Sequence, residues 1–141
     1  MSKGQGFGEC EEISKNTRVK CEEHGRKVVI RNDKRIQVRR IRIDGCVITD
    51  GPRCDFLVLL ADRPDEVYIE LKGCDIGHAV EQLEATIGQV SADKAGVAKV
   101  CYVACSHVPK MQTAIQRHAT RFARHYNARL HVKSNYIEHV L

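Results

Sequence analysis

The sequence predicts an α/β fold in which a mixed central β-sheet is flanked by helices. Residues 56–61 and 99–105 are continuous apolar runs of strand length, which is typical of strands buried on both faces. Residues 76–90 and 108–126 instead repeat their apolar side chains at helical spacing. Because strands and helices alternate along the second half of the chain, we expect helices packed on the faces of the sheet.

A length of 141 residues fits one domain with a hydrophobic core of its own. The first eight residues are rich in glycine, so we expect residues 1–8 to be flexible and residues 9–141 to form the domain. No apolar run approaches the length that spans a membrane, and the N-terminus lacks the apolar centre of a signal peptide. The sequence therefore predicts a soluble, cytoplasmic protein.

The N-terminal part of the chain is less clearly patterned. Residues 9–23 are mostly polar, and we expect a helix there. Residues 28–30 and 36–38 are apolar runs separated by a turn signal, which predicts a hairpin. The apolar residues then change parity before residues 41–43, and a bulge at residues 39–40 would reconcile the two phases.

The centre of the chain predicts a second hairpin. The turn residues Asp62–Asp65 separate the strand 56–61 from another extended run. Side chains alternate along a strand, so Glu70 and Lys72 leave this second strand on one face. Asp55 precedes the first strand, and the hairpin therefore brings it to the same end of the sheet.

The elements after the hairpin have clear boundaries. Asp75 is a suitable cap for the helix that begins at Ile76. Residues 128–132 predict a final strand after the second helix. The C-terminal residues 136–141 are apolar enough to pack onto the fold or onto a second subunit.

Asp55, Glu70 and Lys72 form a set suited to the hydrolysis of phosphodiesters. Carboxylates hold Mg²⁺ in an oxygen-rich site, where the ion neutralises charge that develops on the phosphate. The structural alternative is that Lys72 only pairs with one of the acids at the strand end. Asp44 competes with Asp55 for the metal, but a turn at Asp44-Gly45 explains that residue, and one short hairpin joins Asp55 to Glu70.

An aspartate, a hairpin and a Glu-x-Lys tripeptide resemble the PD-(D/E)xK nuclease superfamily. Asp55, Glu70 and Lys72 match its motif, with Cys54 in place of the proline. The resemblance implies a restriction-endonuclease-like αβββαβ core and a metal-dependent nuclease that acts on nucleic acid, with DNA as the expected substrate. It also implies that Asp55, Glu70 and the backbone carbonyl of Leu71 bind Mg²⁺ or Mn²⁺, while Lys72 orients or deprotonates the attacking water.

The resemblance implies further site residues and an assembly. Gln82, ten residues after Lys72, lies where exonuclease-like branches carry an active-site glutamine; an ordinary exposed amide is the alternative. An N-terminal helix often supplies another metal-binding glutamate, for which Glu11 and Glu12 are candidates unless they simply face solvent. Enzymes of this class that cut duplex DNA usually act as dimers, so we expect a homodimer.

The positive charge of the chain indicates a polyanionic partner. The formal net charge is +5, and arginines are concentrated on one expected strand and one expected helix. The expected nucleic-acid-binding residues are Arg39, Arg40, Arg117, Arg121 and Arg124. A catalytically inactive nucleic-acid-binding module of the same fold is the alternative function, and a merely solvated basic surface is the simplest interpretation of the charge.

Seven cysteines are many for a chain of this length. Their number is odd and no export signal is evident, so we expect reduced thiols, most of them small core residues. A zinc site would recruit Cys10, Cys21 and His24, but no paired Cys-x-x-Cys with a matching second half is present. The sequence therefore favours thiols without zinc.

Overall fold

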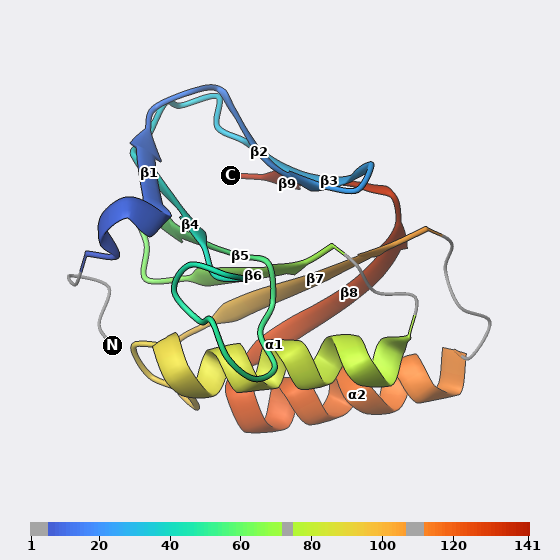
Figure 1. Cartoon of the computed structure of the whole chain (residues 1–141). Coiled ribbons are helices and arrows are strands. Elements are labelled where there is room, and N and C mark those ends of the chain that lie inside the picture. The colour runs from blue at the N-terminus through green and yellow to red at the C-terminus, as the bar shows by residue number, and fades with distance from the viewer. Residues whose placement is uncertain (1–5, 72–74, 107–111) are drawn as a thin grey trace.

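The computed structural model describes residues 6–71, 75–106 and 112–141. These residues form three layers, which are a three-stranded sheet, a six-stranded sheet and a pair of α-helices (Figure 1). The helices cover one face of the large sheet, and the small sheet covers the other. The predicted α/β class with a mixed central sheet is therefore confirmed, but the expectation of helices on both faces is wrong, because the small sheet occupies one of them.

The large sheet has the strand order β1-β4-β5-β6-β7-β8. Its strands are β1 (Glu11–Ser14), β4 (Val38–Arg42), β5 (Phe56–Leu60), β6 (Glu66–Glu70), β7 (Lys99–Cys105) and β8 (Ala128–Ser134). Strands β1, β4, β5 and β6 pair antiparallel, whereas β6, β7 and β8 pair parallel. The central hairpin β5–β6 is therefore confirmed.

Two helices make the parallel connections of the large sheet. Helix α1 (Ile76–Val90) joins β6 to β7, and α2 (Gln112–Tyr126) joins β7 to β8. Asp75 caps α1 as predicted, because its Oδ1 accepts a hydrogen bond of 3.1 Å from the backbone N–H of His78. Neither of these helices, nor any other described one, is long and apolar enough to cross a membrane.

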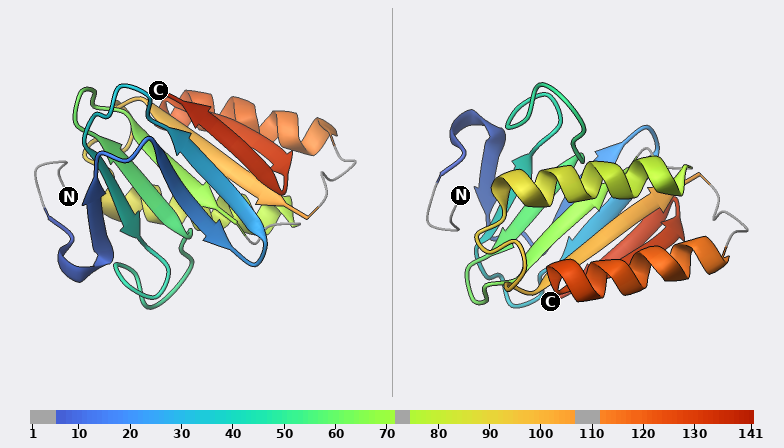
Figure 2. Two further views of the ribbon diagram at one scale, coloured as in Figure 1. Left: turned by 90° about the horizontal axis from the view of Figure 1, so that it is seen from above. Right: turned by 90° about the horizontal axis from the view of Figure 1, so that it is seen from below.

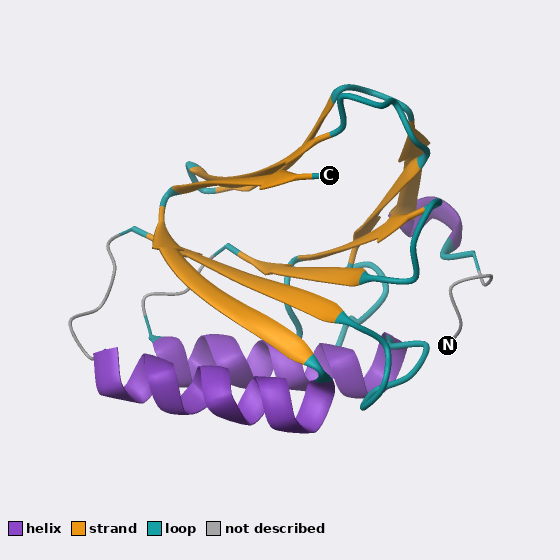
Figure 3. Ribbon diagram, turned by 180° about the vertical axis from the view of Figure 1, so that it is seen from behind, coloured by secondary structure: helices purple, strands orange, loops and turns teal. Residues whose placement is uncertain are grey.

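The small sheet contains β2 (Arg18–Glu23), β3 (Arg26–Arg31) and β9 (Tyr136–Val140), in the order β2-β3-β9. Strands β2 and β3 form a hairpin, and β9 adds to β3 in parallel. Views from above and below place this sheet and the helices on opposite sides of the large sheet (Figure 2), as does the view from behind (Figure 3). The C-terminus therefore packs onto its own fold. The strand predicted at residues 128–132 is confirmed as β8, but it is not the final strand, because β9 follows it.

The central strands of the large sheet are buried on both faces, and each face packs into a hydrophobic core of its own. Along β5, Leu57 and Leu59 pack in the core beneath the helices, whereas Phe56, Val58 and Leu60 pack in the core beneath the small sheet. The odd-numbered and the even-numbered side chains of β5 thus pack against different layers. This two-sided packing explains the unbroken apolar run in the sequence.

Two-sided burial also explains the change of parity in β4. Val38 packs beneath the small sheet and Ile41 packs beneath the helices. Strand β4 pairs residue by residue with β1 and β5, so the bulge predicted at residues 39–40 is wrong.

The hairpin predicted between residues 28 and 38 is also wrong, because β3 and β4 belong to different sheets. Buried Asn32 stabilises the crossing between them. Its Nδ2 donates to the carbonyls of Ile36 and Asn16 at 2.8 and 3.0 Å, and its Oδ1 accepts from the N–H of Ile36 at 3.0 Å. The turn signal in the sequence therefore marks a change of sheet.

The helix predicted for residues 9–23 is wrong as well. A short 3₁₀ helix, η1 (Gly8–Cys10), is followed by β1 and β2. In β2, Val19 and Cys21 are buried while the alternate residues are exposed or half-buried, which is the period of a strand. Phe7, just before η1, is buried in the core beneath the helices.

Cys10 and Cys46 form a disulfide, with their Cα atoms 5.7 Å apart. The expectation of reduced thiols is wrong for this pair, and the sulfur of Cys10 is not available to the zinc set considered from the sequence. Four other cysteines are buried thiols, as predicted for small core residues: Cys21, Cys54, Cys101 and Cys105. The disulfide attaches η1 to the loop that follows β4.

Candidate active site

The candidate site lies at the edge of the large sheet where β4 ends, β5 begins and β6 ends. Arg42 of β4 is opposite Phe56 of β5, which is opposite Ile69 of β6. Asp55 immediately precedes β5, and Glu70 is the last residue of β6. The hairpin therefore brings both predicted acids to one edge, and each is only 1% exposed.

Backbone and side-chain hydrogen bonds hold Asp55 in place. Its Oδ2 accepts a hydrogen bond of 2.7 Å from the N–H of Leu71. Its own N–H donates to the carbonyl of Ile69 at 3.0 Å, and its carbonyl accepts from Ile43 at 2.9 Å. The carboxylate therefore has a fixed position between the end of β4 and the end of β6.

Gln82 connects α1 to both sides of the hairpin. Its Nε2 lies 3.4 Å from Oε2 of Glu70, and its Oε1 accepts a hydrogen bond of 2.9 Å from the N–H of Arg53. One turn later, Oγ1 of Thr86 accepts a hydrogen bond of 2.8 Å from the N–H of Cys54. The structure thus places the side chain of Gln82 beside Glu70. The alternative considered from the sequence, an ordinary exposed amide, is wrong.

Three carboxylates from separate segments converge at this edge. One oxygen each of Glu23, Asp44 and Asp55 lies within 4.8 Å of the others. Asp44, which the sequence presented as a rival of Asp55, is therefore its neighbour, and its turn position does not exclude it. The sequence analysis did not identify Glu23 as a site residue. Residues 9–23 are mostly polar and were expected to form a helix, so strand β2, which places Glu23 at this edge, was not predicted.

Two arginines also reach this edge. Arg53 pairs with Asp44, with its Nε 2.7 Å from Oδ1. Arg26 donates a hydrogen bond of 3.3 Å to the carbonyl of Leu71. The carbonyl that was expected to bind a metal therefore has a guanidinium as a partner.

Cys54 lies directly before Asp55 in the chain. Burial raises the pKa of its thiol well above the ordinary value, the nearby Glu70 and Asp55 raise it further, and a hydrogen bond with Thr86 acts in the opposite direction. The thiol therefore stays protonated at neutral pH. Because nucleophiles and metal ligands require the thiolate, Cys54 is a packing residue of the site.

The remaining predicted acids and the strand arginines form ion pairs with each other. Arg39 donates to Glu11 at 2.6 Å, and Arg40 donates to Glu12 at 3.1 Å, across the paired strands β1 and β4. These contacts attach the edge strand β1 to the sheet. Lys72, the predicted catalytic lysine, lies outside the described residues.

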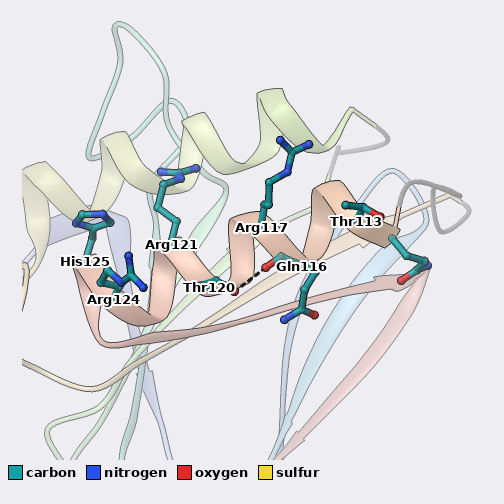
Figure 4. A pocket seen from close by; sticks show the side chains of 8 residues that line it. Thr113, Gln116, Arg117, Thr120, Arg121, Arg124 and His125 are labelled. Atoms are coloured by element: carbon teal, nitrogen blue, oxygen red, sulfur yellow. Dashed lines mark hydrogen bonds between the residues drawn. The ribbon is translucent and has the colours of Figure 1, made fainter.

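The arginines of α2 divide into two kinds. Arg117 and Arg124 are exposed, whereas Arg121 forms an ion pair with Glu84 of α1. Figure 4 shows Arg117, Arg121 and His125 on one side of the helix at successive turns. All three residues line an open cavity of about 700 Å³. Among the described residues of α2, only Phe122 is buried, so most of this basic helix faces solvent.

Glu84 is a charged residue with a structural role. Burial alone would raise the pKa of its carboxyl, but hydrogen bonds from Arg121 and Tyr126 outweigh this effect and lower it. The resulting contact joins α1 to α2. Of the three α2 arginines expected to bind nucleic acid, Arg121 thus has a structural partner within the chain.

No family model, curated protein or solved structure matches this chain.

Proposed function

We propose that the protein is a metal-dependent nuclease that hydrolyses phosphodiester bonds of nucleic acid, with DNA as its substrate. The observation that carries this proposal is the convergence of Asp55 with Glu23 and Asp44, with the buried Glu70 at the end of the neighbouring strand β6. On this proposal, β4, β5, β6, α1 and β7 correspond to most of a restriction-endonuclease-like core, with the β2–β3 hairpin in place of its N-terminal helix.

The spacing of the carboxylates suits a small divalent cation. Opposite ligands of an octahedral Mg²⁺ are about 4.2 Å apart, which is twice the usual Mg–O distance. Adjacent ligands are about 3 Å apart, so three oxygens within 4.8 Å of one another would have to move closer together to share one ion. A bound cation would also relieve the repulsion between these charges, and in phosphodiester hydrolysis it would polarise the phosphate and acidify a bound water.

The residues of this chain would then have distinct roles. Asp55, Asp44 and Glu23 would hold Mg²⁺ or Mn²⁺, and Glu70 would complete the site from β6. Gln82 would be a positioning residue, because it contacts the carboxylate of Glu70 and the backbone just before Asp55. Lys72, two residues after Glu70, would orient or deprotonate the attacking water.

A catalytically inactive nucleic-acid-binding module is the second candidate function. The contacts of Arg53 with Asp44 and of Arg26 with the Leu71 carbonyl favour it, because guanidinium groups already balance part of the negative charge at the edge. Such a module would bind nucleic acid without any requirement for a divalent metal. Divalent-metal dependence therefore separates the two functions.

The proposed activity also implies an assembly. A nuclease that cuts both strands of duplex DNA needs two sites, so we propose a homodimer. The cytoplasm is the proposed compartment, and the Cys10–Cys46 disulfide, a kind of bond that is rare there, is the observation against it.

The experiment is incubation of the purified protein with plasmid, linear duplex and single-stranded DNA and with RNA, each in Mg²⁺, Mn²⁺, Ca²⁺ or EDTA. The nuclease proposal predicts cleavage of DNA in Mg²⁺ or Mn²⁺ and none in EDTA. In the same preparation, Lys72→Met should still bind Mn²⁺ by calorimetry but should no longer cleave. Binding of nucleic acid without cleavage in any metal would support the inactive module instead.

A further inference from the structure

Positive charge is segregated in the second half of the chain. Residues 94–137 contain eight Lys or Arg residues and no Asp or Glu, so this segment has a formal charge of +8. The rest of the chain has 15 basic and 18 acidic residues, for a formal charge of −3. The segment that contains β7, α2 and β8 is therefore strongly positive, and α2 accounts for only part of its charge.

One face of β8 carries a regular row of basic and ring side chains. Ala128 and Leu130 face the core beneath the helices. By strand alternation, Arg129, His131 and Lys133 emerge on the opposite face, where both cations are exposed and His131 is half-buried. In the described part of the chain β8 is the outer strand of the large sheet, so this row, called here the β8 surface, borders solvent.

The ring at the centre of the β8 surface is held in a fixed orientation. His131 is opposite Tyr102 of β7, and the two rings are stacked with centroids 5.4 Å apart. Tyr102 is itself buried, and its hydroxyl forms a hydrogen bond of 2.6 Å with Nδ1 of His139 on β9. The imidazole of His131 therefore rests on a rigid support, with Arg129 and Lys133 on either side along the strand.

One end of the β8 surface and the candidate active site lie at the same end of the large sheet. Strands β6, β7 and β8 are parallel, and Glu70 is level with Val103 and hence with Val132. Lys133 thus lies at the end of the sheet where β6 ends, on the face that bears the small sheet, whereas Glu70 contacts Gln82 of α1 on the other face. Arg129 lies toward the opposite end. At about 3.3 Å per residue, the two cations are separated by about 13 Å along β8.

We propose that the β8 surface binds a single-stranded segment of nucleic acid that leads into the active site. Arg129 and Lys133 would contact phosphates, and one base would stack on His131. The proposal rests on the proposed function for the class of polymer. Single strands are favoured over duplex because the bases of a duplex are already stacked on each other, whereas an unpaired base is free to stack on a protein ring.

Electrostatics support stacking as the role of His131. Burial lowers the pKa of its imidazole, and the neighbouring Arg129 and Lys133 lower it further. The ring is therefore neutral at neutral pH, and its contribution comes from its flat face while the flanking side chains supply the charge.

The test measures binding by fluorescence anisotropy in EDTA, so that no cleavage takes place. The probes are a labelled oligothymidine and a duplex of equal length. Arg129→Gln with Lys133→Gln removes two charges from the β8 surface, and Lys15→Gln with Lys34→Gln removes two from exposed positions elsewhere. We expect the first pair to weaken single-strand binding at least about tenfold and to lower the salt slope by about 1.4, and the control pair to change neither.

Variants of His131 test the stacking itself. We expect His131→Ala to weaken single-strand binding about tenfold with little effect on the duplex, and His131→Phe to retain binding because it keeps a flat ring. Equal effects of the β8 and control pairs, or equal effects of His131→Ala on single strand and duplex, would overturn the proposal. Failure of the wild-type protein to cleave in Mn²⁺ would instead contradict only the nuclease activity, since binding is measured without metal.

Discussion

The N–H of Leu71 donates a hydrogen bond of 2.7 Å to Oδ2 of Asp55. Because Leu71 directly follows Glu70, this hydrogen bond holds the carboxylate of Asp55 close to the end of β6. Asp55→Asn can keep this hydrogen bond through its amide oxygen while it loses the charge. We expect the variant to lose Mn²⁺ binding and cleavage but to remain folded, with unchanged or higher stability in the absence of metal, because repulsion from Glu23 and Asp44 falls.

Asp55→Ala separates the structural role of this residue from the chemical one. It leaves the N–H of Leu71 without the carboxylate acceptor in a buried place, which should lower the free energy of unfolding by about 1–3 kcal/mol. Urea unfolding and Mn²⁺ calorimetry on both variants measure these effects. Cleavage by Asp55→Asn at the wild-type rate would remove Asp55 from the site.

Glu23 and Glu22 give a matched pair, because neighbouring residues of β2 face opposite sides of the strand. Glu23 is half-buried beside Asp44 and Asp55, whereas Glu22 is exposed. We expect Glu23→Gln to weaken Mn²⁺ binding at least about tenfold, and Glu22→Gln to leave it unchanged. Equal metal affinities of the two variants in calorimetry would show that the β2–β3 hairpin contributes nothing to the metal site.

The arginines of α2 should separate into binding and structural groups. Arg117→Ala with Arg124→Ala should weaken binding similarly for unrelated duplex sequences and should lower the salt slope by up to about 1.8, at about 0.9 per lost phosphate contact. Arg121→Ala should instead lower stability by up to about 1 kcal/mol, because its partly exposed pair with Glu84 is lost. An unchanged salt slope in the double variant would mean that this face only meets solvent.

Histidines beneath and beside the small sheet should make stability depend on pH. Burial lowers the pKa of His139 below its ordinary value of 6.5, with further lowering by Arg129 and Arg63 and partial opposition from Asp65. Between the lowered pKa and 6.5 the unfolded chain binds more protons than the folded protein. The free energy of unfolding should therefore fall as pH decreases from about 7.5 to 5.

His139→Gln should reduce this pH dependence, measured by urea unfolding at several pH values. His78→Gln, which changes an exposed histidine at the start of α1, is the control and should leave the dependence as it is in the wild-type protein. An identical pH profile for His139→Gln and the wild-type protein would exclude His139 as a source of the effect.

Local signals predicted the second half of the fold well. The strand β5, the cap at Asp75 and the helical spacing of α1 lie within short segments whose pattern reports the structure directly. The small sheet could not be predicted in this way, because β3 pairs in parallel with β9 from the other end of the chain. Such a pairing depends on contacts between segments that have no relation in sequence.

The candidate site shows the same division. Asp55 and Glu70 are joined by one short hairpin, so their proximity followed from the sequence. Glu23 reaches them only because the small sheet lies over the large one and carries the end of β2 to the edge. The sequence predicted a turn at Asp44-Gly45, and the φ of 77° at Gly45 agrees with a turn. This turn does not exclude Asp44 from the site, because it brings the carboxylate of Asp44 close to that of Asp55.

The most direct test of the proposed nuclease is DNA cleavage by Glu70→Gln, compared with the wild-type protein and with Glu81→Gln. Glu70 is buried in the candidate site, whereas Glu81 is an exposed acid on α1, next to Gln82. We expect the wild-type protein and Glu81→Gln to cleave DNA in Mn²⁺ and not in EDTA. Folded Glu70→Gln should cleave at least about a hundredfold more slowly. Cleavage by Glu70→Gln at the wild-type rate, or wild-type cleavage that persists in EDTA, would contradict the proposed function.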